Sequence, residues 1–427
     1  MTTKNLFRVI VAASLLSVFN AVSLAQYGST RPRRVTTNTA TPPANNDAAH
    51  ATGTTTIAPA SDNVPSQPSA TSSAASTSVT RASGGVADTS RAYALLQQKQ
   101  YAAAASEAKQ IAASDPSNAE AWKIAGFAEA SLQQYADAAV DLQRALDLQR
   151  AAKAEDPNTV DALAQALVRT EAFDRALPLL VASTTRAGAR PDAGMLYLRG
   201  ISEYRTNKAA DAERSFNAAV RANPKDAASL FYLGRIAYER NDFDKAVQML
   251  NRATLASPRE PVAWSLLTSS YLQRAALSAA NNDAASTARA DADYQSAVRA
   301  GETLFRLKPD TSGALVYGQA LLSAKRYAPA ATILERAAAG DDAPAATFYL
   351  LGVAYSRAKN YPKAITTLER AAQKTPDDAN VYRELGYDYE ISKQYARALA
   401  AYQKGAGLLP DDTDFKASIE RVRPFAK

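Results

Sequence analysis

One pattern recurs nine times along the chain: a position that is nearly always aromatic is followed three residues later by alanine. The first positions are Tyr101, Tyr135, Phe173, Ala209, Phe243, Tyr294, Tyr327, Tyr361 and Tyr395, and the alanines are Ala104, Ala138, Ala176, Ala212, Ala246, Ala297, Ala330, Ala364 and Ala398. Most neighbouring pairs are about 34 residues apart. A period of this length indicates a repeat protein, in which each unit must stack on its neighbours to bury its apolar face.

The segment from Ala227 to Pro258 illustrates the content of one repeat. Apolar residues at helical spacing precede a turn at Asn241 and Asp242, and a second such set follows it. The first set is Leu230, Leu233, Gly234 and Tyr238, and the second is Phe243, Ala246, Leu250 and Ala253. Pro258 comes next, and proline is tolerated after a helix but not inside one. The segment is therefore predicted to be a hairpin of two helices.

These landmarks resemble the tetratricopeptide repeat, whose pattern is W-x2-L-G-x2-Y followed by A-x3-F-x2-A and a proline. In the segment above, Leu230 and Leu250 replace the Trp and the Phe, and Tyr238 comes one place late. The first-helix glycine is present as Gly126, Gly200, Gly234, Gly318, Gly352 and Gly386, and both tryptophans, Trp122 and Trp264, fall at the opening position. The resemblance covers residues 86 to 424 and implies an all-α fold, an α-solenoid of about nine helix hairpins.

The end of the chain and two irregular repeats depart from the uniform period. The segment from Asp411 to about Arg423 is predicted to be a terminal helix that caps the solenoid, with Phe415, Ile419 and Val422 covering the last repeat. The interval from Tyr135 to Phe173 is 38 residues instead of about 34, which predicts an extra helical turn. The sixth repeat carries an insertion at about residues 275–291, predicted to form a longer, protruding hairpin that either contacts a partner or is neutral.

The N-terminal region differs in composition from the repeats. Residues 1–25 have the features of a secretory signal: basic Lys4 and Arg8, an apolar stretch, and a small-residue cleavage site ending at Ala25. The apolar stretch is shorter than the roughly 20 residues that span a bilayer, so cleavage before Gln26 is expected in preference to an anchor. Residues 26–85 are rich in Thr, Ser, Ala and Pro and are expected to be a disordered linker that would suit glycosylation. The signal therefore predicts export to the periplasm or the cell surface of a bacterium. Residues 86–427 are predicted to form the solenoid.

The net charge of +7 gives little reason to expect a nucleic-acid partner. Residues 1–85 contain six basic and two acidic side chains, which accounts for +4 of the total and leaves +3 for the repeats. A nucleic-acid groove needs basic residues clustered on a folded face, and the sequence has no such cluster. No transmembrane segment is expected beyond the signal region.

The residues that most enzymes and metal sites need are scarce. The chain has no cysteine and one histidine, His50 in the predicted linker, which excludes Cys/His dyads, Ser/His/Asp triads and histidine-based metal sites. The acidic pairs Asp377-Asp378 and Asp411-Asp412 precede predicted helices, where Asp caps free N–H groups. No catalytic residue, metal site or cofactor is predicted, and carboxylate chemistry is the only enzymatic alternative left.

The resemblance implies that function resides on the face formed by the first helices, where many members of the family hold a peptide or a partner helix. Family positions that face this groove are aromatic or arginine in the fourth and fifth repeats and again in the eighth and ninth, whereas the sixth and seventh offer Ser265, Leu266, Ser269, Ser312 and Gln319. The predicted partner-binding residues are Tyr197, Tyr204, Arg205, Phe231, Tyr232, Arg235, Tyr238, Tyr349, Arg357, Arg383 and Tyr387. The clamp that grips a C-terminal carboxylate is not expected, since no asparagine occupies Arg235, Val353 or Tyr387.

The sequence therefore predicts a non-enzymatic scaffold in the bacterial envelope that binds a protein or peptide client. Two alternatives remain at this point. One is a structural component that assembles with copies of itself, and the other is a carboxylate-based hydrolase.

Overall fold

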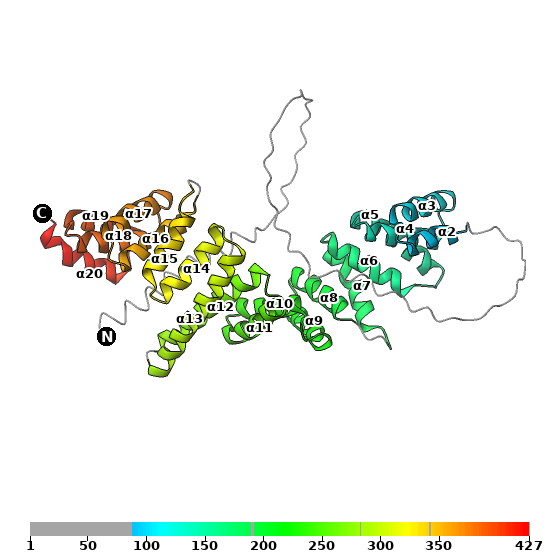
Figure 1. The fold of residues 1–427 in the computed structure, drawn as a ribbon, viewed down its shortest axis with the longest axis horizontal. Coiled ribbons are helices and arrows are strands. Elements are labelled where there is room, and N and C mark those ends of the chain that lie inside the picture. The colour runs from blue at the N-terminus through cyan, green and yellow to red at the C-terminus, as the bar shows by residue number, and fades with distance from the viewer. Residues whose placement is uncertain (1–87, 189–191, 282, 341–342, 427) are drawn as a thin grey trace, which may run out of the picture. The chain divides into compact units, whose positions relative to one another are not determined.

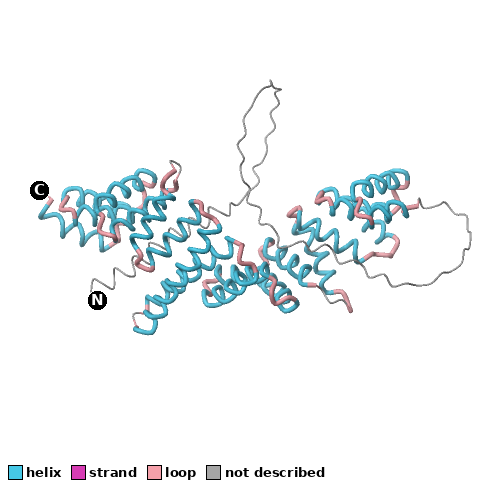
Figure 2. The backbone as a smooth tube through the Cα atoms, viewed as in Figure 1, coloured by secondary structure: helices cyan, strands magenta, loops and turns pink. Residues whose placement is uncertain are grey.

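The computed structural model describes residues 88–188, 192–281, 283–340 and 343–426. These residues form 19 α-helices, α2 to α20, and a short 3-10 helix, with no strand among them (Figures 1 and 2). The predicted signal and linker lie outside the described residues. The helices divide into two units whose boundary falls between Arg240 and Asn241.

The first unit contains α2 (Ser90–Gln97), α3 (Tyr101–Ser114), α4 (Ala119–Ser131), α5 (Tyr135–Ala151), α6 (Pro157–Arg169), α7 (Phe173–Thr185), α8 (Ala193–Arg205), α9 (Ala209–Ala222) and α10 (Ala227–Glu239). The second contains α11 (Phe243–Ala256), α12 (Pro261–Ala280), α13 (Ala284–Leu307), α14 (Thr311–Ser323), α15 (Tyr327–Ala337), α16 (Ala345–Arg357), α17 (Tyr361–Lys374), α18 (Ala379–Ile391), α19 (Tyr395–Leu408), α20 (Thr413–Val422) and η1 (Arg423–Phe425). Even-numbered helices up to α18 are the first helices of the nine repeats, and odd-numbered ones are the second helices.

The predicted all-α solenoid of nine hairpins with a terminal helix is confirmed. Within each unit every helix packs against the next one along the chain, and consecutive first helices also touch, as α6 and α8 or α16 and α18 do. Eight of the nine recurring positions are the first residue of a second helix, as Tyr361 is of α17. The exception is Tyr294, which lies inside α13 because the insertion extends that helix toward its N-terminus. α12 and α13 are 20 and 24 residues long and are joined by a short turn.

Within each unit, small residues let the two helices of a hairpin approach closely. All nine recurring alanines are fully buried. A Cβ added at Gly352 would lie 2.5 Å from Cγ of Leu368 on the paired helix, and one at Gly386 would collide with the ring of Tyr402. These glycines are therefore required by packing and not by their backbone conformation.

The turn inside most hairpins contains a non-glycine residue in the left-handed conformation. Lys359 has φ 64° and Lys393 has φ 60°, and the corresponding residue of six other hairpins is also left-handed. After α16, the N–H of Lys359 donates to the carbonyl of Ser356 and the N–H of Asn360 donates to that of Tyr355. This is the Schellman arrangement, which satisfies the last carbonyls of a helix and usually places glycine at the left-handed position.

The opening position of a first helix is linked to the proline that closes the preceding repeat. The indole of Trp122 donates to the carbonyl of Pro116 (3.1 Å), and that of Trp264 donates to the carbonyl of Pro258 (2.8 Å). Tyr382 makes the equivalent bond to Pro376 through its hydroxyl. A polar atom on a large ring at this position therefore fixes the entry into the next hairpin.

Acidic side chains cap several helices, as predicted for the acidic pairs. Asp378 accepts from the N–H of Asn380 at the start of α18, and Asp412 accepts from the N–H groups of Asp414 and Phe415 at the start of α20. The terminal helix α20 buries Phe415 against Gly405 of α19.

Candidate functional site

Aromatic side chains of α8 and α10 form one continuous cluster centred on Tyr232. Its ring stacks on Phe216 of α9 with centroids 5.2 Å apart and contacts the edges of Tyr204 (5.5 Å) and Phe231 (5.3 Å). The ring centroid of Tyr197 lies 6.3 Å from that of Tyr232. Phe216 is fully buried, whereas the four rings on the first helices are partly exposed. We call the surface formed by Tyr197, Tyr204, Phe231, Tyr232 and Arg235 the α8–α10 face.

Arg235 is held in place over this cluster. Its guanidinium carbon lies 5.2 Å from the centroid of the Tyr204 ring, and its Nε donates to Glu239 one helical turn further on (3.0 Å). The hydroxyl of Tyr204 donates to the same carboxylate oxygen (2.5 Å). Burial and this hydrogen bond raise the pKa of Tyr204 above its usual range, so the phenol stays neutral. About a quarter of the Arg235 side chain (24%) remains exposed.

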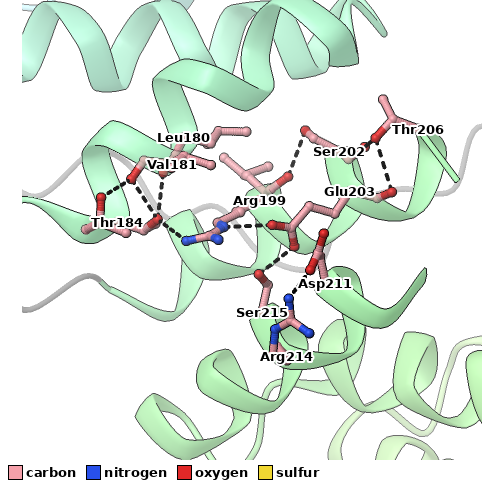
Figure 3. A network of polar contacts seen from close by, with 12 residues as sticks. Leu180, Val181, Thr184, Arg199, Ser202, Glu203, Thr206, Asp211, Arg214 and Ser215 are labelled. Atoms are coloured by element: carbon pink, nitrogen blue, oxygen red, sulfur yellow. Dashed lines mark hydrogen bonds and ion pairs between the residues drawn. The ribbon is translucent and has the colours of Figure 1, made fainter. Parts of the chain in front are cut away.

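A polar network fixes the orientation of α8 against its neighbours (Figure 3). Arg199 donates to Glu203 of its own helix (2.8 Å) and to Thr184 at the end of α7 (3.0 Å). Ser215 of α9 donates to the other oxygen of Glu203 (2.6 Å), whose side chain is nearly fully buried. Because a buried carboxylate that loses its partners is strongly destabilising, this network resists rotation of α8.

Arg205 and Tyr238, the remaining predicted site residues of these repeats, lie on the same two helices. Arg205 at the end of α8 is exposed and lies 4.8 Å from the centroid of the Phe173 ring, with Glu171 at 3.4 Å. Tyr238 on α10 is half-buried. The structure thus places all the residues predicted for the fourth and fifth repeats on α8 and α10, and five of them form the α8–α10 face.

The two arginines predicted in the eighth and ninth repeats, Arg357 and Arg383, are bound to acidic partners. Arg357 forms two bonds of 2.9 Å to Glu384 and lies 5.8 Å from the centroid of Tyr387. Arg383 donates to Asp412 (2.7 Å) and lies 4.2 Å from the centroid of Phe415, so it fastens the terminal helix to α18.

Tyr349 on α16 is a core residue, with only 4% of its surface exposed. A partner could reach its ring only after repacking of the core. Ser269 and Gln319, at first-helix positions of the sixth and seventh repeats, are also buried, with 2% and 7% exposed. Among the predicted positions, those on α8 and α10 therefore provide the more accessible surface.

Two buried carboxyl clusters were not predicted. Asp388 of α18 is fully buried and accepts from Ser356, and burial raises its pKa to about 7. Glu129 of α4 and Asp141 of α5 are buried beside Lys109 of α3, and burial raises the pKa of Glu129 to about 7.

In the described part of the chain, no group of three or more ligating side chains could hold a metal ion. No described helix has both the length and the apolar character needed to cross a membrane.

The i,i+4 spacing of Arg235 and Glu239 is visible in the sequence and could have identified this ion pair. The pairing of Asp388 with Ser356 and of Glu203 with Ser215 depends on which faces of separate helices meet. No local pattern in the sequence predicts either of these two pairings.

The arrangement of paired helices defines an α-solenoid of helix hairpins, and comparison with known proteins identifies the repeat. The profile of the tetratricopeptide repeat matches residues 89–157, 197–261 and 349–413. A second profile, described as anaphase-promoting complex, cyclosome, subunit 3, matches residues 290–371. None of the curated proteins matches this chain. The chain is a tetratricopeptide repeat protein.

Solved structures similar to this chain include several repeat proteins. MamA from Desulfovibrio magneticus RS-1 is 21% identical, with 44% of this chain and 96% of that chain covered and a TM-score of 0.36. YrrB, described as a TPR protein with an unusual peptide-binding site, is 15% identical over 49% of this chain and 99% of its own, with a TM-score of 0.39. A tetratricopeptide repeat protein from Parabacteroides merdae ATCC 43184 is 14% identical, with 62% of this chain and 98% of that chain covered and a TM-score of 0.40.

Tetratricopeptide arrays typically act as scaffolds for protein–protein interaction and not as enzymes, and the repeats of this chain support that role.

Proposed function

We propose that the protein binds a segment of a client protein, an extended peptide or a helix, on the α8–α10 face. The observation that supports this site is the partly exposed aromatic cluster with Arg235 held above it. Aromatic and arginine side chains dominate the energies of protein interfaces, because rings bury a large area with few rotamers and guanidinium stacks and hydrogen-bonds at once.

The rigidity of the α8–α10 face favours binding. Tyr232 is stacked on the buried Phe216, Tyr204 and Arg235 share the carboxylate of Glu239, and Glu203 ties α8 to α9. Side chains that are already ordered lose less conformational entropy when a partner binds, which increases the affinity.

The proposed place of action is the bacterial envelope. The basic, apolar and small-residue order of residues 1–25 supports export, and cleavage after Ala25 would release a protein that begins at Gln26. The client is accordingly expected among periplasmic or surface proteins.

Photo-crosslinking in the living host tests the proposal. A benzophenone amino acid in place of Phe231 keeps an aromatic ring on the α8–α10 face and should form a covalent adduct with the client. The same amino acid in place of Arg214, a highly exposed side chain on α9, is the matched control and should form no such adduct. Equal adducts at both positions would contradict the proposed site. Adducts that contain only this chain would instead support self-assembly.

A further inference from the structure

Three exposed cations occupy the same position on three consecutive second helices. Arg336 on α15, Arg370 on α17 and Lys404 on α19 each come six residues after the recurring alanine of their helix and are spaced 34 residues apart. All three are exposed. We call them the basic column. It lies on the second helices of the second unit, whereas the α8–α10 face belongs to the first unit.

Each cation of the basic column is held over an aromatic ring. Arg370 lies 4.3 Å from the centroid of Phe348, and Lys404 lies 4.7 Å from that of Tyr382. Both rings occupy the opening position of the first helix in the same repeat. The seventh repeat has Ala314 at that position, and Arg336 instead lies 4.9 Å from the centroid of Phe305 on α13. The charge is thus kept at one place in each repeat even though the ring beneath it changes.

No carboxylate of the described residues forms an ion pair with the three cations, in contrast to Lys363 on α17 and Arg397 on α19. Glu335 and Glu369 directly precede Arg336 and Arg370 but contact other groups. Glu335 accepts from Tyr355 and pairs with Lys363, and Glu369 accepts from Tyr389 and pairs with Arg397. The acidic side chains nearest in sequence are therefore already paired, and the charge of the column is not neutralised by them.

We propose that the basic column binds an acidic polypeptide segment, one rich in Asp and Glu, that runs across the second helices of the seventh to ninth repeats. Carboxylates match the planar fork of arginine and are complementary in charge to all three cations. Regular spacing lets one extended segment contact several cations at once, so that individually weak surface pairs act together.

A nucleic acid fits this surface less well than an acidic peptide. Binding of single strands relies on exposed rings on which bases stack, and the rings here lie beneath the cations. Phe348 and Tyr382 are 1% and 6% exposed. A peptide needs only the cations themselves.

Fluorescence anisotropy with the full-length protein tests the proposal, using a labelled oligoglutamate of about ten residues as the probe. Replacing the column (Arg336→Gln, Arg370→Gln and Lys404→Gln together) should weaken binding by about tenfold or more and flatten its dependence on salt. The control replaces Arg150, Arg214 and Arg240 by Gln. These exposed arginines belong to the first unit and are paired with Glu155, Asp211 and Glu213. The control variant loses the same total charge as the column variant, and its binding should change by less than about threefold.

Absence of binding by the parent protein, or an equal loss in the column and control variants, would overturn the proposal. Tighter column-dependent binding of an oligonucleotide of equal charge, or of anionic vesicles, would overturn it in favour of that ligand. If the triple variant fails to fold, Lys404→Gln alone must still weaken the binding of oligoglutamate.

Discussion

The hydroxyl of Ser356 donates a hydrogen bond of 2.5 Å to Oδ1 of Asp388 where α16 and α18 meet, and both side chains are buried. The other carboxylate oxygen of Asp388 has no partner among the described residues. Arg357 lies nearby but is bound to Glu384, whose negative charge also opposes ionisation of Asp388.

This pair predicts that protonation of Asp388 stabilises the contact between the eighth and ninth repeats. The pKa of Asp388 is about 7 when folded, against an ordinary value of 3.8, so the folded state holds a proton that the unfolded chain releases. The contribution of Asp388 to stability is greatest below about pH 4, falls as the pH rises to about 7 and is constant above that. The difference is at most about 4 kcal/mol. Asp388→Asn should remove this dependence, as measured by hydrogen exchange of α16 to α19 at pH 5 and pH 8. An unchanged pH dependence in the variant would rule out Asp388 as its source.

The left-handed residues in the hairpin turns predict that substitution by glycine increases the stability of the protein. Lys359→Gly and Lys393→Gly should each stabilise the protein by about 0.5–1 kcal/mol, because a side chain in this conformation costs about that much and glycine does not. Lys416→Gly, at an exposed position inside α20, should instead destabilise the protein by a similar amount, because glycine is unfavourable inside a helix. Thermal unfolding of the three variants measures both effects. A lower stability of Lys359→Gly or Lys393→Gly than of the parent would contradict the left-handed turn.

Packing at Gly386 predicts local damage. Gly386→Ala would push a methyl group into the ring of Tyr402 and should cost about 1–3 kcal/mol. Because repeats contact chiefly their neighbours, hydrogen exchange should accelerate in α18 to α20 and change little in α4 to α7. Gly407→Ala is the control, since a Cβ there meets no atom within 4 Å. Uniform loss of protection after Gly386→Ala would mean that the array unfolds as one cooperative unit.

Export predicts a defined N-terminus. Protein isolated from the envelope of the host should begin at or near Gln26, because the small residues ending at Ala25 suit signal cleavage. N-terminal sequencing checks this. A sequence that begins at Met1 or Thr2 would indicate a retained anchor instead.

The fold was largely predictable from the sequence because each repeat carries its own landmarks. The recurring positions mark the first residue of eight second helices, which is aromatic in seven of them, and the recurring alanines are all buried. Tyr294 shows where this rule fails: the insertion before it is itself helix-forming, so the helix begins ten residues earlier, at Ala284.

The candidate site was only partly predictable. Spacing alone places Tyr197 and Tyr349 at first-helix positions of the same kind, yet Tyr349 belongs to the core and Tyr197 is partly exposed. The difference depends on which side chains of the neighbouring helices surround each ring, and the spacing within one repeat does not specify them. The position of Arg235 over Tyr204 likewise requires α10 to pack beside α8, which one repeat by itself does not specify.

The central claim is that the α8–α10 face binds the client, and a charge reversal at Arg235 tests it most directly. Once the crosslinked client segment is known, its affinity for the parent, Arg235→Glu and Arg214→Glu proteins can be measured by calorimetry. Arg235→Glu should weaken binding by roughly 2 kcal/mol, or about thirtyfold, as interface anchors do. Its melting temperature should change little, because a partly exposed i,i+4 pair contributes only about 0.5 kcal/mol. Arg214→Glu should bind as the parent does. Equal affinity of the Arg235→Glu variant and the parent, or a loss that merely follows unfolding, would contradict the account.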